Sequence, residues 1–505
     1  MAFVYSSMEK HYFRGAFPRK AGCIILLSCL GISVGCTRSV PGPQEPKYLQ
    51  LTVTLPENWT ASANTDGKIT HGPSTAAPKT GTATDTLPDG SETSWLTGFD
   101  DPVLRSLVAE ALGKNFDLEA AAARVEAARA NAKQEGAEKL PDITAGFSAS
   151  RTKQNTAGRS KNSSSGGIFN RFDLNANISW ELDLWDRIDN TVKAAVAEAE
   201  ASRADYRAAR LALAANVAYA WFDTIEADQQ LRLADKTVAS FENSLKAIEQ
   251  RYRLGIGAAL DVRLARENLA SARGQRHSRV RDRDVAIRSL EILLGRYPAG
   301  ALNIQQELPE LGQAVPAGLP ADLLNRRPDI AGANARLLAT EHHLGAARAN
   351  RLPTIGLTAT GGTASDTLRD LLDWESLVWS LAGDLAQPIW RGDRLSAEVA
   401  LAEANRQEAW AEYTSVVLQA LREVESALTA QVLLAEQQAA LRVAEEEATA
   451  AVMLAQDQYR QGLSDIVTLL STQRREFDAK SSLLDITKQR LHVRIDLHLA
   501  LGGGF

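Results

Sequence analysis

Cysteine is almost absent from this chain of 505 residues. The three cysteines, Cys23, Cys29 and Cys36, all lie in the first 36 residues, so the rest of the chain can form neither a disulfide nor a thiolate metal site. Histidine is also scarce, and His492 and His498 are six positions apart, which is not the i,i+4 spacing of a helical metal pair. These absences predict a protein without a metal, a cofactor or a catalytic site, and therefore not an enzyme.

Long apolar runs and an excess of basic charge are absent as well. Beyond residue 36 no stretch holds 18 apolar residues in succession, so no transmembrane helix is expected. The chain has 62 acidic and 56 basic residues, a net charge of −6, which argues against nucleic acid as a partner.

Glycine and proline are missing from two windows, 186–254 and 393–461. Each window holds 69 residues and is rich in Ala, Leu, Glu, Arg and Gln, which are good helix formers. A helix of that length spans about 100 Å. We therefore expect coiled-coil packing, either within a layer of several helices or as a single solvated coiled coil.

What the chain does contain is a long duplication. Residues 139–144, KLPDIT, return at 351–356 as RLPTIG, and residues 251–255, RYRLG, return at 458–462 as QYRQG. The shifts of 212 and 207 residues indicate a repeated unit far longer than a solenoid module. We predict a first structural repeat at 95–310 and a second at 311–505.

Both repeats read in the same order. An Ala-rich helical segment, 103–138 or 319–350, precedes a strand, a polar loop and a second strand that ends near a tryptophan. The long helix follows, then a turn with Tyr and Gly, then a returning helix. The predicted fold is mixed α and β, with four strands per chain and long helical hairpins.

The segment 172–184 alternates strictly between apolar and polar residues. The apolar side contains Leu174, Ile178 and Trp180, and the polar side contains Asp173, Asn175 and Asn177. Such a strand fits a half-buried soluble sheet, or a membrane barrel with the apolar side toward lipid and the polar side toward a water-filled lumen. Four strands cannot close a barrel and open edges are not tolerated in lipid, so a barrel requires copies of the chain to associate. Three copies would supply twelve strands, although these residues do not choose three copies over two.

The N-terminus has the form of a bacterial secretory leader. A basic stretch, which a start at Met8 would shorten, precedes a short apolar core at 24–34 and then Cys36. A cysteine at the end of a leader accepts the lipid of a lipoprotein, so we expect residues 1–35 to be removed and Cys36 to be acylated. Thr37 in the next position favours the outer membrane. Residues 36–94 then serve as lipid anchor and flexible tether, rich in Thr, Ser, Gly and Pro.

Several motifs carry a family resemblance. Residues 95–104 read WLTGFDDPVL and residues 324–330 read LNRRPDI, while Tyr252 and Tyr459 stand three residues before Gly255 and Gly462. Together these motifs resemble the TolC family of outer-membrane efflux proteins, in its lipidated OprM/NodT-like branch. The resemblance covers residues 95–502, and it identifies the two Tyr-Gly turns as periplasmic tips.

The resemblance implies a homotrimer with a twelve-stranded barrel in the outer membrane of a Gram-negative bacterium and a long helical barrel in the periplasm. The implied function is a passive exit duct for an inner-membrane pump, proton-driven, joined through a periplasmic adaptor protein. A structural coiled-coil lipoprotein that spaces membranes and a type I protein-secretion duct are the alternatives. The cargo stays open between a drug, a metal, a metabolite and a protein.

The resemblance also implies that the duct closes at the tips of its hairpins. In the family a tyrosine there bonds to an aspartate of the first-repeat turn, and these positions correspond to Tyr459 and Asp261. A constricting ring of carboxylates, common in relatives, is absent because Thr468 and Ser471 occupy its positions. Asp465, one helical turn away, is the expected substitute.

Overall fold

The computed structural model describes Trp59 and residues 94–153, 167–304, 306–312, 315 and 323–503. The chain divides into Met1–Gln50 and Leu51–Phe505, and every described residue belongs to the second unit. The predicted leader, Cys36 and the tether, apart from Trp59 and Ser94, lie outside the described residues. Across the described ranges, no helix is both long and apolar enough to cross a membrane.

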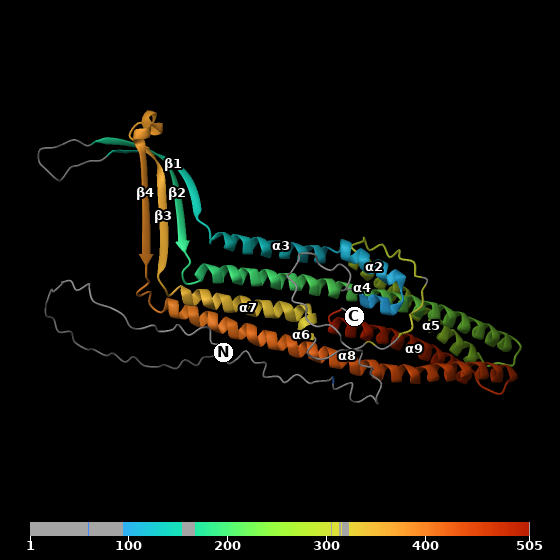
Figure 1. The fold of residues 1–505 in the computed structure, drawn as a ribbon. Coiled ribbons are helices and arrows are strands. Elements are labelled where there is room, and N and C mark those ends of the chain that lie inside the picture. Colours follow the sequence, from blue (N-terminus) through green and yellow to red (C-terminus); the bar gives the residue numbers. More distant parts are fainter. Residues whose placement is uncertain are drawn as a thin grey trace, which may run out of the picture. The chain divides into compact units, whose positions relative to one another are not determined.

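The order of elements repeats in the two halves of the chain (Figure 1). The first half contains η1 (Ser94–Phe99), α2 (Pro102–Lys114), α3 (Phe116–Ala137), β1 (Asp142–Lys153), β2 (Ile168–Leu182), α4 (Arg187–Arg253) and α5 (Ala259–Leu293). The second half contains α6 (Leu323–Arg326), α7 (Pro328–Ala349), β3 (Thr354–Ser365), η3 (Arg369–Leu372), η4 (Trp374–Ser376), β4 (Leu377–Ala386), α8 (Arg394–Gln461) and α9 (Ile466–Ala500). Helices α5 and α9 both have 35 residues, and strands β1 and β3 both have 12. The duplicated mixed α and β fold is confirmed.

The two windows without glycine and proline form the two longest helices. Helix α4 has 67 residues and α8 has 68, so each spans about 100 Å. The first half of α4 buries mostly alanine, at positions Ala194, Ala195, Ala197, Ala199, Ala201 and Ala204. These small side chains let neighbouring helices approach closely, and α3 and α7 both pack against α4.

The Ala-rich segments are each broken in two, which composition does not reveal. Asn115 separates α2 from α3, because its side-chain oxygen accepts the backbone N–H groups of Asp117 and Leu118, at 3.0 and 3.1 Å. This is an N-cap, which favours the start of a new helix over continuation of the old one. In the second half Pro328 begins α7 after the short α6, as its fixed φ favours.

The four strands form one antiparallel sheet in the order β1-β2-β3-β4 (Figure 1). Strands β1 and β2 form one hairpin and β3 and β4 another, and the β2–β3 pair joins the two repeats. In the described ranges, each edge strand, β1 or β4, has a partner on one side only.

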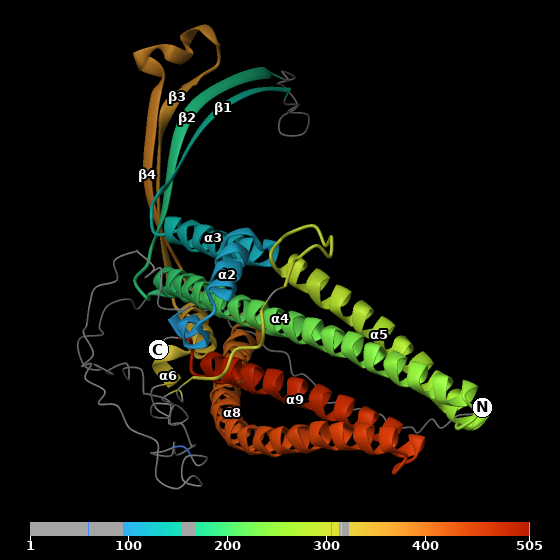
Figure 2. The ribbon, with the colours of Figure 1, turned by 90° about the vertical axis from the view of Figure 1, so that its right-hand side faces the viewer.

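The long helices form two hairpins, α4 with α5 and α8 with α9 (Figure 2). Helix α4 also packs against α9, so the hairpins lie side by side. Among the described residues, the largest buried cluster is formed by η1, α2, α3, α4, α5 and α9, around Trp221 and Phe222. Trp59 is buried against Val424 of α8 and Leu497 of α9.

Candidate functional site

The sheet gathers the apolar residues of all four strands on one face. The register aligns Ile143, Ile178, Ala359 and Leu381 in one row across the sheet. Because side chains alternate along a strand, the neighbouring rows on this face carry Phe147, Leu174, Trp180, Trp379 and Leu385. The large members are exposed, from 37% for Trp180 to 78% for Trp379. The residues of the predicted lipid face, Leu174, Ile178 and Trp180, therefore share this apolar face.

The opposite face of the sheet is polar. The residues of the predicted lumen face, Asp173, Asn175 and Asn177, share it. Thr360 donates to the side chain of Asn177 across the β2–β3 pair, at 2.9 Å. Gly362 lies opposite Asn175, and a Cβ there would stand 2.0 Å from the carbonyl oxygen of Leu174, so only glycine permits this close approach of the strands.

Tryptophans and an aspartate fix the junction between strands and helices. The indole N–H of Trp180 donates to the carbonyl of Lys139, at 3.1 Å, and that of Trp185 to the carbonyl of Pro353, at 2.7 Å. Asp183 accepts the backbone N–H groups of the first turn of α4 at 3.1 and 2.7 Å, which caps that helix. The Asp183 bonds therefore hold the end of β2 to the start of α4, and the tryptophan bonds tie this junction to the residues before β1 and β3.

Glycine ends the first helix of each hairpin in the same way. Gly255 and Gly462 have φ of 75° and 76°, a left-handed conformation that favours glycine. The next residue in each turn, Ile256 or Leu463, donates its N–H to the carbonyl five residues earlier, at 3.1 and 2.8 Å. This is the Schellman motif, so the duplicated Tyr-Gly sequence builds the same turn twice.

The tyrosines of the two turns differ in burial. Tyr252 is 49% exposed, whereas Tyr459 is 9% exposed. Tyr459 belongs to a cluster that unites both hairpins and contains Phe241, Ile248, Val262, Ala265, Leu269, Ala455, Ile466, Leu469 and Leu470. Tyr459 therefore packs the tip of the second hairpin onto the first.

Asp261 and Asp465 both act at helix starts. Asp261 accepts the backbone N–H of Ala258 at 3.3 Å, and Asp465 accepts that of Thr468 at 2.7 Å, which lowers the pKa of Asp465. No hydrogen bond joins Tyr459 to Asp261 among the bonds of the described residues. Burial raises the pKa of Tyr459, and the charge of Asp261 adds to this increase.

Arg251 is a tip residue that the motif did not indicate. Its guanidinium lies over the ring of Tyr459, 5.0 Å from the ring centroid, and its Nη1 donates to the carbonyl of Tyr459 at 3.3 Å. One side chain of α4 thus contacts both the aromatic face and the backbone at the end of α8. The equivalent residue of the second repeat is Gln458, so the duplication gives no hint of the role.

Arg327, in the LNRRPDI motif, connects three helices. It is 8% exposed, pairs with Asp329 at 2.7 Å and Glu423 at 2.8 Å, and donates to the carbonyl of Ala500 at 3.0 Å. These partners lie on α7, α8 and α9. The motif therefore has a structural role at the start of the second repeat.

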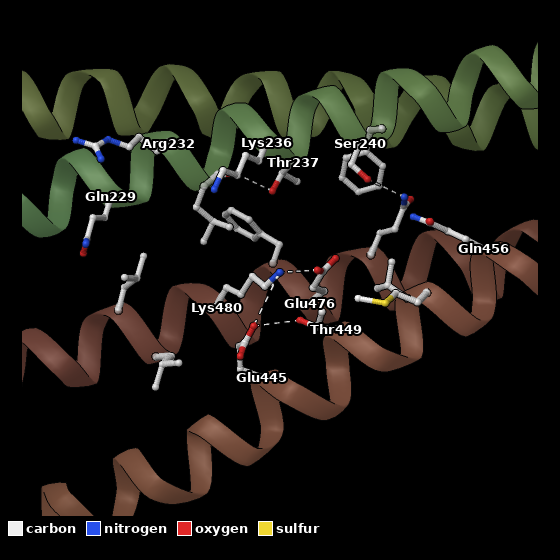
Figure 3. A pocket seen from close by; sticks show the side chains of 18 of the residues that line it. Gln229, Arg232, Lys236, Thr237, Ser240, Glu445, Thr449, Gln456, Glu476 and Lys480 are labelled. Atoms are coloured by element: carbon white, nitrogen blue, oxygen red, sulfur yellow. Dashed lines mark hydrogen bonds and ion pairs between the residues drawn. The ribbon is translucent and has the colours of Figure 1, made fainter. Parts of the chain in front are cut away.

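A cavity of about 660 Å³ lies between α4 and the α8–α9 hairpin (Figure 3). Lys480 points to Glu476 at 2.6 Å and to Glu445 at 3.9 Å, and Gln473 donates to Ser240 at 3.0 Å. Lys480, Glu476 and Glu445 therefore pair with one another inside this cavity. In the described part of the chain, no group of three or more His, Cys, Asp or Glu side chains could hold a metal ion.

Comparison with known proteins gives the family. The family model described as outer membrane efflux protein matches residues 107–296 and 319–503, one segment in each half of the chain. The chain belongs to this family. It is 35% identical over 427 residues to the toluene efflux pump outer membrane protein TtgF of Pseudomonas putida, covering 85% of this chain and 88% of that protein. It is 34% identical over 462 residues to the outer membrane protein OprJ of Pseudomonas aeruginosa, covering 91% and 92%.

Solved structures agree with the family. The outer-membrane channel OprN gives a TM-score of 0.77 at 28% identity, covering 86% of this chain and 99% of that one. The CmeC outer membrane channel of Campylobacter jejuni gives 0.79 at 25% identity, covering 86% and 94%. This outer membrane efflux protein is therefore an outer-membrane channel of an efflux pump in a Gram-negative bacterium. The predicted family, fold class and function are confirmed, and a channel of this kind is not an enzyme.

Proposed function

We propose that three copies of the chain join β4 of one copy to β1 of the next and close a twelve-stranded barrel. The observation that carries this proposal is a four-stranded sheet with one continuous apolar face and two edge strands that each lack a second partner. Open strand edges are not tolerated in lipid, and twelve strands lie within the range of outer-membrane barrels. Recording from the purified protein in a planar bilayer tests the barrel. Stepwise ion conductance is expected, and insertion without conductance would favour the membrane-spacing lipoprotein.

In this barrel the apolar face contacts lipid and the polar face lines the lumen. The lipid side contains Leu174, Ile178 and Trp180, and the lumen side contains Asp173, Asn175 and Asn177. An exposed apolar face of this extent is rare on soluble monomers and is typical of a surface that something apolar covers. The hydrogen bond of Thr360 to Asn177 supports a wet, polar lumen side.

The tips of the hairpins form the periplasmic mouth. A bond between the Tyr459 hydroxyl and Asp261, which the described part of the single chain does not contain, forms in the assembled trimer and holds the mouth closed. Tyr459 is buried in the same cluster as Val262, the residue that follows Asp261, and this packing supports the assignment. Gly255, Gly462 and the exposed Tyr252 shape the turns, and Asp465, exposed at the start of α9, contributes negative charge to the mouth. Tyr459→Phe combined with Asp261→Ala should raise single-channel conductance with the trimer intact. Unchanged conductance in a correctly assembled double variant would contradict this bond.

The assembly carries a lipid and meets two further proteins. Cys36 is acylated after removal of residues 1–35, residues 36–94 act as a tether, and the repeats occupy 95–310 and 311–505. The two family matches, one on each side of residue 310, support that division. A periplasmic adaptor joins the mouth to a proton-driven inner-membrane pump.

Acylation of Cys36 can be tested with labelled palmitate, which should enter the wild-type protein and not the Cys36→Ala variant. Label in the variant would mean that another residue carries the lipid.

The cargo consists of small organic compounds. Relatives at 31–35% identity are named for the efflux of toluene, solvents and antibiotics, and those names support the assignment. Deletion of the gene should lower tolerance to toluene and to antibiotics, and a plasmid copy should restore both. Unchanged tolerance to every compound in a strain without a second channel gene would leave metals, metabolites or secreted proteins as the cargo.

A further inference from the structure

Helices α5 and α8 are the two ends of a row. Helix α4 packs against α5 and α9, and α9 packs against α8, so the helices lie in the order α5-α4-α9-α8. When identical copies are related by rotation, one end of the row must meet the other end of the next copy. In the proposed trimer α5 of one copy therefore faces α8 of its neighbour.

The outward faces of these two helices are suited to a partner. The face of α8 opposite α9 exposes Val432, Glu436, Val443, Leu454 and Asp457, at spacings of three, four, seven and eleven residues. The face of α5 opposite α4 exposes Leu260, Arg263, Arg281, Val285 and Ile292. Both faces mix aliphatic and charged residues, which is the pattern of helices that pack in coiled coils.

The outward faces differ in charge. Four of the eight arginines of α5 pair with acidic residues of α4, and the outward face of α5 keeps Arg263 and Arg281 together with one acidic residue, Glu267. Residues 431–461 of α8 have five acidic residues and two arginines. Among the described residues, no ion pair or side-chain hydrogen bond engages Arg263 or Glu436. Within the part of the chain that the structure describes, Arg281 bonds to Ser278 and Asp282 of its own helix, and Asp457 pairs with Arg460.

The opposite charges also lie at matching heights above the tips. Arg251 lies five residues before Ile256, and Tyr459 lies four residues before Leu463. Because Arg251 and Tyr459 are in contact, the two turns lie at the same height along the helix axes. Arg263 lies seven residues beyond Ile256, and Asp457 lies six residues before Leu463. Arg281 and Glu436 lie 25 and 27 residues from the same two turns. With the helical rise of 1.5 Å, the members of each pair differ in height by about 3 Å or less.

We infer that, in the half of the helical barrel nearest the tips, neighbouring copies are joined by a charged seam between α5 of one copy and α8 of the next. In this seam Arg263 faces Asp457 of the next copy, and Arg281 faces Glu436. The inference rests on the proposed trimer, and it specifies the contact between helices of neighbouring copies, which the pairing of strands in the β-barrel leaves open. Salt weakens exposed charge pairs of this kind. The contact between copies near the tips should therefore weaken as ionic strength rises, whereas the contact between copies in the β-barrel should not.

Disulfide trapping tests the seam directly, because Cys36 is the only cysteine outside residues 1–35. Arg281→Cys combined with Glu436→Cys should give covalently linked oligomers on a non-reducing gel. Arg281→Cys combined with Asp457→Cys is the matched control, since those positions differ in height by about 28 Å, and it should give many-fold less. Each single variant controls for Cys36. An intact trimer without this difference would overturn the seam, and a chain that forms no trimer would overturn the assembly with it.

Charge reversal gives an independent measurement. Arg263→Glu should raise single-channel conductance several-fold at low salt, and adding Asp457→Arg should return it to the wild-type level. The effect of the single reversal should shrink in high salt, because the Debye length falls from about 10 Å at 0.1 M to 3 Å at 1 M. A double reversal that conducts like the single one, in trimers of normal stability, would overturn the pairing.

Discussion

At the scale of single residues, the tip depends on a difference between equivalent positions. Tyr252 and Tyr459 occupy the same place in the two repeats, yet only Tyr459 is buried between the hairpins. Arg251 then lies over its ring, whereas Gln458 stands at the position equivalent to Arg251 in the second repeat. The duplication produced two copies of one turn. Because the surrounding side chains differ, only the tyrosine of the second turn packs between the two hairpins.

The contact of Arg251 with Tyr459 leads to a prediction for the tip. Cation–π contacts contribute about 0.5–2 kcal/mol, depending on desolvation, so Arg251→Ala should open the mouth and raise conductance severalfold. Arg251→Lys should have a smaller effect, because a lysine keeps the charge and loses the planar stacking. Single-channel recording measures both.

Arg253→Ala is the matched control, since Arg253 is an exposed arginine of the same turn. It should leave conductance unchanged. Equal increases from Arg251→Ala and Arg253→Ala would point to loss of general positive charge instead of the contact with Tyr459.

At the scale of elements, strand β2 has one apolar face and one polar face. Arginine on the lipid side near mid-membrane costs about 2–4 kcal/mol, while a lumen position tolerates it. We therefore expect Ile178→Arg to reduce the yield of assembled trimer strongly and Asn175→Arg to reduce it little. Quantification of heat-resistant trimer in outer-membrane fractions measures the yield. Equal losses from the two variants would mean that the faces are assigned wrongly.

Helix α2 is tied to the end of α5 by an ion pair that predicts a dependence on pH. Glu110 accepts from Arg296 at 2.8 Å and from Lys114 at 3.1 Å, and these bonds lower the pKa of Glu110 to about 2. A carboxyl with a lowered pKa stabilises the fold at pH above its unfolded value of about 4.3, and this contribution is lost as pH falls toward 2.

The corresponding variant is Glu110→Gln. It should lower the melting temperature at pH 7, and the difference from the wild type should vanish near pH 2. Circular dichroism of the detergent-solubilised protein measures both. Glu119→Gln, an exposed position on α3, should have no effect at either pH. A loss of the same size at pH 7 and pH 2 would rule out the ion pair as its cause.

The elements differ in how far the sequence alone reveals them. Absence of glycine and proline was sufficient for α4 and α8, and strict alternation was sufficient for β2, because each signal extends over many residues. The break at Asn115 was not foreseen, since one capping residue competes with a continuous helical pattern only through local hydrogen bonds. The contact of Arg251 with Tyr459 was not foreseen either, because it depends on how two helices from different repeats pack.

At the scale of the whole molecule, the sheet predicts the number of copies. A chain of 54.6 kDa before processing supplies four strands, and three chains supply twelve. Native mass spectrometry of the detergent-solubilised protein should give three times the mass of the processed chain. A mass of two or four chains would exclude the twelve-stranded barrel while leaving the fold of the single chain as described.

The pairing of β2 with β3 also sets the order in which the chain can fold. Leu182 pairs with Ile355, so the whole α4–α5 hairpin must emerge between the two strands before they meet. Each strand hairpin is local and forms early, but the pair that joins them is separated by a loop whose closure is entropically costly and slow. Until the second repeat joins it, the first repeat must therefore wait with the edge of β2 exposed, which is an aggregation hazard. A nascent chain of this architecture consequently depends on being shielded until its second half arrives.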